Sequence, residues 1–241
     1  MDITDKTDKT DKTDIADIAG KHNLIVIEGL DGSGKGTQTA RLCEAIRAAG
    51  HAVRHISFPN YEDTSAALVK SYLAGEFGGS PDAVNAYAAS SFYAVDRYAA
   101  YRKHWSGDYL RGVNIVADRY ATSNAVYQMT KLPQAEWDDY LRWLEDYEYR
   151  LLALPRPDVV LYLDMPPEIS QKLMSGRYDG DESKKDIHEA DVSFQALCRR
   201  SALYAADRLG WHVVTCGEGG HPRGIDDIAA QLWSLTKDHL I

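Results

Sequence analysis

The sequence has few cysteines and no long apolar run, and each shortage excludes a class of protein. Cys43, Cys198 and Cys216 are the only cysteines among 241 residues, and they lie far apart without C-x-x-C spacing. This distribution argues against a zinc site or a disulfide framework and favours a reduced, cytoplasmic setting. No stretch approaches the roughly 18 consecutive apolar residues that span a membrane, and the polar, acidic first residues do not resemble a secretory signal. We therefore expect a cytoplasmic protein with no membrane partner.

Basic residues are also in the minority. Lys and Arg together number 27 against 36 Asp and Glu, which gives a net charge of −9. Binding to a nucleic-acid backbone calls for a basic face, so we expect no nucleic-acid partner. Residues 1–17 contain the triplet D-K-T three times and no apolar periodicity, and we expect residues 1–20 to be a disordered leader. Residues 22–241 then have the length of one domain.

Short apolar runs alternate with longer helix-like segments along this domain. The predicted strands are 24–27, 52–57, 113–117, 159–163 and 211–215, and the predicted helices include 35–49, 82–105, 137–154 and 225–239. Continuous apolar strands separated by helices are typical of a parallel sheet covered on both faces. We therefore predict an α/β fold, a three-layer α/β/α sandwich around a five-stranded parallel sheet, with ligands bound beyond the carboxyl ends of its strands.

A phosphate-binding loop follows the first predicted strand. Gly29, Gly34 and Lys35 match the pattern G-x-x-x-x-G-K between an apolar run and a helix. Backbone N–H groups converge on phosphate oxygens in such a loop, and the lysine reaches the β- and γ-phosphates. The hydroxyl that usually follows the lysine arrives one position late, because Gly36 precedes Thr37. The loop predicts nucleotide binding by Gly29, Gly32, Ser33, Gly34, Lys35, Gly36 and Thr37.

Two further features narrow the class of P-loop protein. No N-K-x-D guanine-specificity motif follows the loop, which argues against a GTPase. The third predicted strand leads into Asp118 and Arg119, whereas motor and transporter ATPases usually place a glutamate after the aspartate. A carboxylate beside an arginine suits a site that holds Mg²⁺ and a second phosphate group together.

Four motifs in order make the chain resemble the thymidylate kinases, a family of P-loop nucleoside monophosphate kinases. They are E-G-x-D-G-x-G-K, F-P-x-Y, F-Y-A-x-D-R and D-R-Y-x-x-S-N-x-x-Y, and the resemblance runs from about residue 23 to the C-terminus. It implies a transferase of nucleotide biosynthesis that moves the γ-phosphoryl of ATP onto dTMP, giving dTDP and ADP. It also implies Mg²⁺ as the cofactor, a homodimer packed through helices such as 82–105, and a P-loop NTPase fold with a mobile lid.

The resemblance assigns catalytic and metal-binding roles to individual positions. Asp31 matches a carboxylate that faces the 3′-hydroxyl and phosphate of the acceptor, and Arg119 matches the arginine that grips the dTMP phosphate. Asp118 resembles a carboxylate that helps to place Mg²⁺, a task that Thr37 shares. The implied catalytic residues are Lys35, Asp31, Arg119 and Arg177.

The remaining motif positions are expected to bind the nucleoside of dTMP. Tyr93 matches the aromatic residue that stacks on thymine, and Arg97, one helical turn later, matches the arginine that donates to thymine O4. The other implied contacts are Asn124 and Tyr127, at the base edge and the sugar 2′ position, and Phe58 and Pro59, in an apolar wall. Alternatives remain at this stage: Tyr93 could be a core residue, and Arg97 could form a surface pair with Asp96 or another acid. Phe58 and Pro59 could serve only to pack a turn.

A charged segment without steady periodicity, at about 176–190, is expected to be the lid over ATP. The lids of related enzymes carry D-R-x-E, but residues 186–189 read D-I-H-E, with Ile187 in place of the arginine. Arg177, Lys184 and Lys185 are then the candidates for the catalytic cation, and we favour Arg177. A solvated surface loop is the alternative.

Other functions remain open on the sequence alone. The stretch G-S-G-K-G-T also occurs in adenylate kinases, so another nucleoside monophosphate kinase or a deoxynucleoside kinase of the same fold is possible. The altered lid leaves open a nucleotide-binding protein that does not catalyse. The sequence does not decide whether dUMP is accepted beside dTMP.

Overall fold

The structure is a computed structural model that describes residues 22–78, 80, 83–177 and 192–241, without the side chains of 174–177 and 192. The predicted leader over 1–20 and the predicted lid from residue 178 onward therefore lie outside the described residues. No helix among the residues described is long and apolar enough to cross a membrane.

A five-stranded parallel sheet forms the centre of the molecule, in the order β2-β3-β1-β4-β5. Its strands are β1 (Leu24–Gly29), β2 (Val53–Ser57), β3 (Asn114–Asp118), β4 (Val159–Asp164) and β5 (His212–Thr215). Each predicted strand is present, with ends shifted by one or two residues. Every residue of β1 is buried, since this strand pairs with β3 on one side and β4 on the other.

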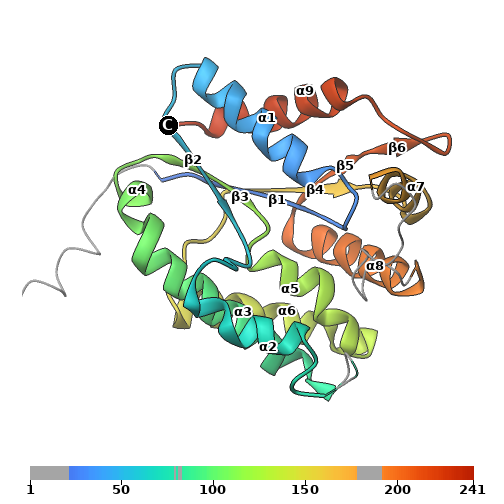
Figure 1. Cartoon of the computed structure of the whole chain (residues 1–241). Helices are drawn as coiled ribbons and strands as arrows, with labels where there is room; N and C mark the ends of the chain where they lie inside the picture. The colour runs from blue at the N-terminus through green and yellow to red at the C-terminus, as the bar shows by residue number, and fades with distance from the viewer. Residues whose placement is uncertain (1–21, 79, 81–82, 178–191) are drawn as a thin grey trace, which may run out of the picture.

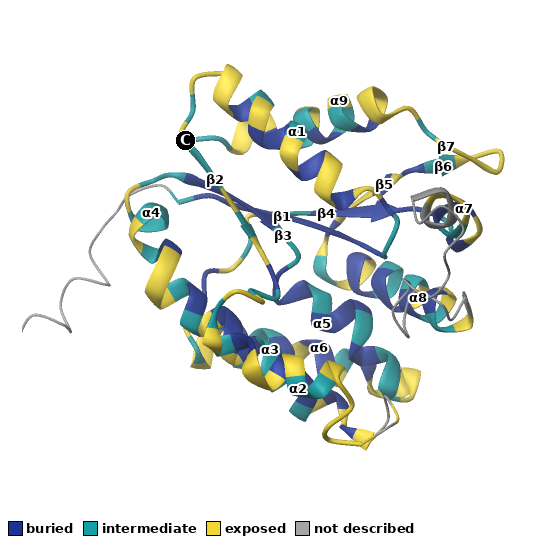
Figure 2. Cartoon of the chain, in the orientation of Figure 1, coloured by how far each residue is buried: buried dark blue, intermediate teal, exposed yellow. Residues whose placement is uncertain are grey.

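Helices cover both faces of the sheet and confirm the predicted three-layer α/β/α fold (Figure 1). The helices on one face are α1 (Lys35–Ala48) and α9 (Ile225–Thr236). The helices of the other face are α2 (Ala67–Leu73), α3 (Ala86–Ala100), α5 (Thr122–Tyr127), α6 (Trp137–Glu145) and α8 (Val192–Leu209). Apolar side chains of the strands fill the interface between the sheet and each helical layer. The outer faces of α1 and α9 are exposed (Figure 2).

Two of the predicted long helices change their winding before they end. The predicted helix 82–105 begins at Ala86 and passes from α3 into a π turn, Tyr101–Trp105, and then into α4 (Ser106–Leu110). The predicted helix 137–154 is α6 followed by a second π turn, Asp146–Leu151. The second of these turns carries Glu148, which is fully buried.

Several short elements have no counterpart among the predicted segments. They include α2, α5, the helix α7 (Pro167–Arg177) and a two-stranded hairpin of β6 (Gly217–Glu218) and β7 (His221–Pro222). The position of α5 matters most for function, because this helix follows directly on the turn that leaves β3. The carboxyl ends of β1, β2 and β3 thus bring the phosphate loop, the F-P motif and the D-R-Y motif to one edge of the sheet.

Candidate active site

The phosphate loop joins β1 to α1 through two glycines in the left-handed region. Gly32 has φ 75° and Gly34 has φ 87°, values that L side chains rarely adopt. Gly34 is the N-cap of α1, and no side chain caps this helix or places a carboxylate in its first turn. The N-terminal N–H groups and the helix dipole are therefore left for an anion.

Lys35 is held inside this loop. Its side chain is buried, and Nζ donates to the carbonyl oxygen of Leu30 at 2.8 Å and lies 3.9 Å from Oδ1 of Asp31. Burial, followed by the positive charge of Arg119, lowers the pKa of Lys35 to about 8. The loop therefore presents a confined cation where the terminal phosphates of a nucleotide would lie.

Arg119 connects the loop to the neighbouring strand. Its Nη2 donates to Oδ1 of Asp31 at 2.5 Å, and its Nη1 donates to the hydroxyl of Tyr127 at 3.0 Å. Burial alone would lower the pKa of Arg119, but the nearby Tyr127 and Asp31 outweigh burial and raise it, so the guanidinium stays charged. Its backbone has φ 69°, a strained value for a side-chain-bearing residue that often marks a functional position.

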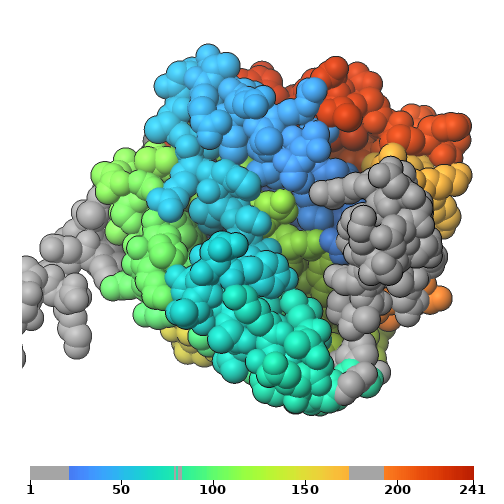
Figure 3. All heavy atoms as spheres, in the orientation of Figure 1, coloured from blue at the N-terminus to red at the C-terminus, as the bar shows by residue number. Residues whose placement is uncertain are grey.

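A cavity of about 350 Å³ opens beside Arg119. Figure 3 shows green atoms of the segment after β3 in a recess between the blue atoms of α1 and the teal atoms of α2. The cavity is lined by all the predicted dTMP contacts, which are Asp31, Phe58, Pro59, Tyr93, Arg97, Arg119, Asn124 and Tyr127. The structure thus brings these residues together, and their roles towards dTMP stay predictions.

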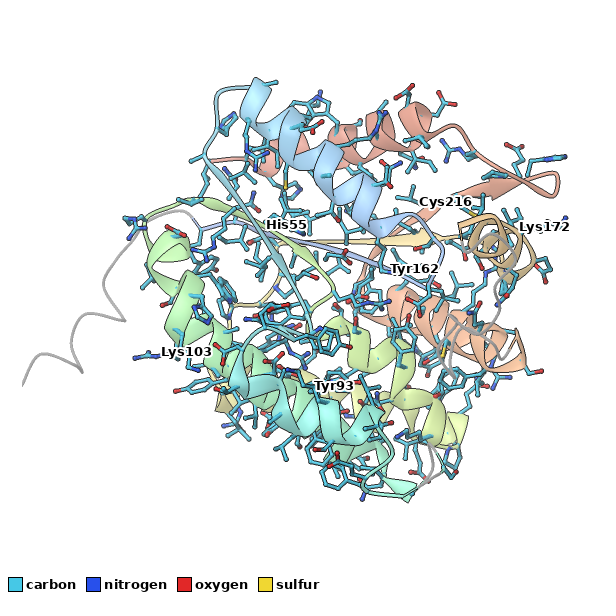
Figure 4. The ribbon with its side chains drawn as sticks, viewed as in Figure 1. His55, Tyr93, Lys103, Tyr162, Lys172 and Cys216 are labelled. Atoms are coloured by element: carbon cyan, nitrogen blue, oxygen red, sulfur yellow. The ribbon has the colours of Figure 1, made fainter. Side chains whose placement is uncertain are left out.

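Aromatic side chains form much of the cavity wall. Tyr93 lines the cavity from α3 and lies edge-on to Tyr72 of α2, with ring centroids 6.4 Å apart. In Figure 4, Tyr93 lies on α3 beside α2, and Lys103 lies further along the helical run towards α4. Tyr93 is therefore a wall residue of the cavity, although it also packs on neighbouring aromatic rings.

Arg97 is not part of a surface pair with Asp96. It is 2% exposed, and its Nε donates to Oε2 of Glu148 at 3.1 Å. Asp96 instead accepts hydrogen bonds from the backbone of Asn60, at 3.0 Å, and from the hydroxyl of Ser65, at 2.7 Å. Arg97 thus faces the cavity, whereas its neighbour on α3, Asp96, anchors the loop that follows the F-P motif.

Glu28, Gln128 and Glu148 are among the polar groups of the site that were not predicted from the sequence. Gln128 lines the cavity and is 5% exposed, and its Oε1 has no hydrogen-bond partner among the described residues. In the sequence, Gln128 directly follows the last tyrosine of the D-R-Y motif. Its place next to this motif is the feature from which a role in the site could have been predicted. Glu148 has no motif around it.

Glu28 lies on β1 beneath the turn that carries Arg119. Its carboxylate accepts hydrogen bonds from the backbone of Tyr120 at 3.1 Å, from Thr122 Oγ1 at 2.6 Å and from Ser123 Oγ at 2.9 Å. Burial raises the pKa of Glu28, while the positive charge of Arg119 and these hydrogen bonds act in the opposite direction. Glu28 is the first residue of the E-G-x-D-G motif. The motif therefore identified this position in the sequence but did not indicate that its carboxylate supports the turn that carries Arg119.

The start of α1 also offers oxygen ligands for a metal ion. Thr37 is exposed in the first turn of α1, and Asp118 ends β3. A Cβ on Gly36 would lie 3.9 Å from Oδ2 of Asp118, which places this carboxylate next to the first turn of α1. Hydroxyl and carboxylate oxygens fit Mg²⁺. No group of three or more His, Cys, Asp or Glu gathers among the described residues, so water and phosphate oxygens would have to complete the shell.

The fold and the site together define a P-loop phosphotransferase, with a phosphate loop on the central strand and a cavity lined by two arginines beside it. A family model described as Thymidylate kinase matches residues 27–217, and the chain belongs to the thymidylate kinase family of ATP-dependent nucleoside monophosphate kinases. This result confirms the fold class and the family that the motifs predicted.

Similar proteins span bacteria and eukaryotes. A thymidylate kinase of Mycobacterium tuberculosis is 35% identical over 76% of this chain and 84% of its own length. One of Ruegeria pomeroyi is 29% identical over 90% of this chain and 95% of its own length. The solved structure of thymidylate kinase from Candida albicans has a TM-score of 0.65 at 22% identity, covering 90% of this chain and 92% of that one, and it supports the fold alone.

Proposed function

We propose that this protein transfers the γ-phosphoryl group of ATP to dTMP, giving dTDP and ADP. The observation that carries the proposal is the position of Arg119, which reaches Asp31 of the phosphate loop and also lines the cavity beside it. A side chain in this position contacts the phosphate of an acceptor next to the terminal phosphate of the donor.

Catalysis in this site is mainly positioning and charge neutralisation. An oxygen of the acceptor phosphate forms a bond to the γ-phosphorus while the bond to the β,γ-bridging oxygen breaks, and that electron pair leaves with ADP. Lys35 and the loop N–H groups hold the donor phosphates, and Arg119 holds the acceptor phosphate with a planar fork. The acceptor phosphate is already an anion at neutral pH, so no general base is required.

Mg²⁺ would be held by Asp118 and Thr37 together with water. When bound, it neutralises charge on the phosphates. The proposed lid cation is Arg177, whose backbone ends α7 and whose side chain lies outside the described residues. Lys184 and Lys185 are the alternatives, and both also lie outside the described residues.

The base end of the cavity supports thymine as the acceptor base. Arg97 supplies N–H donors, and Asn124, whose Nδ2 donates to Glu148 and to the carbonyl oxygen of Ser90, is left with its amide oxygen as an acceptor. Thymine offers the complementary pair, an O4 acceptor and an N3–H donor. Tyr93 from α3 and Phe58 from the loop after β2 provide the apolar walls.

We also propose a cytoplasmic homodimer that assembles through α2 and α3. Leu68 on α2 is 43% exposed, and Val95 and Tyr98 on α3 are 46% and 42% exposed. Grouped apolar side chains of this kind on adjacent helices favour contact with a second subunit.

A coupled kinase assay tests the function by comparing dTMP, dUMP, dCMP, dGMP and AMP with ATP as the donor. The expected result is the highest kcat/KM with dTMP. A higher value with dCMP, dGMP or AMP would contradict the proposed acceptor, and binding of ATP without turnover of any acceptor would contradict the proposed enzyme.

A further inference from the structure

Glu148 is a buried carboxylate to which neither the motifs nor the proposed reaction gives a role. It lies in the π turn Asp146–Leu151 and is 0% exposed. π turns inside helices frequently occur at functional sites. A buried carboxylate is stable only when charged or polar groups compensate it, so its partners indicate what it does.

The partners of Glu148 are two residues that line the acceptor cavity. Arg97 binds its carboxylate through two nitrogens: Nε donates to Oε2 at 3.1 Å and Nη2 donates to Oε1. Nδ2 of Asn124 donates to Oε1 at 3.3 Å. One carboxylate therefore fixes the orientation of both residues, and the forked contact with Arg97 adds geometric specificity.

The contact with Glu148 decides which end of the Asn124 amide is available to a ligand. Nδ2 of Asn124 faces Glu148 and also the carbonyl oxygen of Ser90, at 3.4 Å. The group that remains for a ligand in the cavity is therefore the amide oxygen, which accepts hydrogen bonds.

The same contact leaves Arg97 as a donor towards the cavity. A guanidinium carries more N–H groups than are used by its contacts with Glu148 and with the carbonyl oxygen of Tyr120, which lies 3.4 Å from Nη1. The charge of Glu148 also keeps Arg97 compensated in a position where it is 2% exposed. Without this partner, the guanidinium would be a buried charge free to turn away.

We propose that Glu148 is a positioning residue that sets pyrimidine specificity by fixing the order of donor and acceptor at the base end of the cavity. The inference rests on the proposed function and deepens it. Arg97 offers a donor, while the amide oxygen of Asn124 offers an acceptor. Thymine and uracil carry the complementary O4 and N3–H, whereas cytosine carries an N4 amino donor and an N3 acceptor and is mismatched at both positions.

The substitution Glu148→Gln tests this inference, because it keeps the shape and removes the charge. A glutamine can donate towards Asn124, so the asparagine amide is free to reverse and present its NH₂ group to the cavity. We expect the ratio of kcat/KM for dTMP over dCMP to fall by about tenfold or more, since sites built on hydrogen bonds discriminate strongly. The KM for dTMP should rise by about tenfold with a smaller change in kcat, because the phosphate contacts are intact.

Two further variants make the result specific. Glu145→Gln is the same chemical change three residues earlier, at a carboxylate that pairs with Arg156 and does not line the acceptor cavity. It should leave the acceptor ratio within about twofold of wild type. Glu148→Asp keeps the charge and should restore part of the ratio that Glu148→Gln loses.

The ratio is measured on a single preparation, so a lower folded fraction cancels and poor folding of a variant does not hide the outcome. An unchanged ratio in Glu148→Gln, or a loss of kcat with an unchanged KM for dTMP, overturns the role of Glu148 while the proposed function stands. A wild-type protein that does not prefer dTMP to dCMP overturns the proposed function, and the inference with it.

Discussion

In the proposed mechanism a single side chain, that of Arg119, serves both substrates. It is held by Asp31 from the loop after β1 and by Tyr127 from α5, and its own backbone has φ 69°. The backbone of Arg119 is thus strained, and hydrogen bonds to two different elements hold the side chain of this residue in place. A flexible lysine has the same charge but only a single point of contact.

Arg119→Lys should therefore damage acceptor binding more than donor binding. We expect the KM for dTMP to rise about tenfold or more, because a bidentate contact is lost, while the dissociation constant for ATP changes little. Steady-state kinetics and calorimetric titration with ATP measure the two effects. Arg102→Lys, at an exposed position of the first π turn, is the control. An unchanged KM for dTMP in Arg119→Lys would refute the phosphate-binding role.

The buried charge of Lys35, which its proposed role requires, lowers the stability of the folded protein. Burial first, and then Arg119, lower its pKa from 10.5 to about 8. Below about pH 8 the charge is buried in the folded protein. Between about pH 8 and 10.5 the unfolded chain keeps a proton that the folded protein has lost, so the wild-type protein gains stability as the pH rises through this window.

Lys35→Met should abolish turnover and yet raise the free energy of unfolding at pH 7, by roughly 1–3 kcal/mol. The gain over wild type should shrink as the pH rises from about 8 to 10.5. Urea unfolding at several pH values measures the effect. Lys70→Met, an exposed position on α2, serves as the control without this pH dependence. A Lys35→Met protein that is less stable than wild type at pH 7 would be incompatible with a buried, destabilised charge.

At the scale of elements, the strands were predictable because both faces of the sheet are covered. The strand Leu24–Gly29 is buried at every position, so its first four residues are all apolar, and this run can be recognised in the sequence without knowing which strands pair with it. The loop and the D-R-Y motif were predictable for a similar reason, since their chemistry is local in sequence. The polar residues that follow β1 and β3 both belong to the site.

Elements held by distant contacts were not predictable. The short helix α5 begins with Thr-Ser-Asn, residues of low helix propensity, and packs against α8. Glu148 occupies a π turn that no periodicity reveals, and its partner Arg97 lies 51 residues away in the chain. Gln128 joins the cavity only because α5 directs it there. The missing part of the site thus depends on tertiary packing rather than on sequence pattern.

The carboxylate of Glu28 ties β1 to the turn between β3 and α5. Glu28→Gln should loosen this turn, because an amide group cannot accept from Tyr120, Thr122 and Ser123 in the way that two carboxylate oxygens do. We expect the free energy of unfolding to fall by about 1–3 kcal/mol and the KM for dTMP to rise. Urea unfolding and steady-state kinetics measure these effects, with Glu44→Gln on the exposed side of α1 as the control. Full stability in Glu28→Gln would contradict this role.

For the whole molecule, the exposed apolar side chains of α2 and α3 predict the subunit contact. Val95→Glu places a charge among them and should convert a dimer into a monomer, because an unpaired charge is costly in a buried interface. Light scattering after size-exclusion chromatography gives the mass directly. Val213→Glu, on the edge strand β5, changes a similarly exposed valine on another part of the surface and should leave the dimer intact. A monomeric wild-type protein, or a dimeric Val95→Glu protein, would contradict the assignment.

The residues that line the acceptor cavity have an unusual distribution along the chain. Apart from Asp31 and Phe194, they all lie between Ser57 and Lys131. The donor loop precedes this stretch. The cavity proposed for the second substrate is therefore built almost entirely from one continuous segment of the sequence. If the proposed function is correct, exchanging that segment between related kinases should transfer the choice of acceptor and leave the donor loop unchanged. Glu148 lies outside it, and such a graft would have to carry that residue as well.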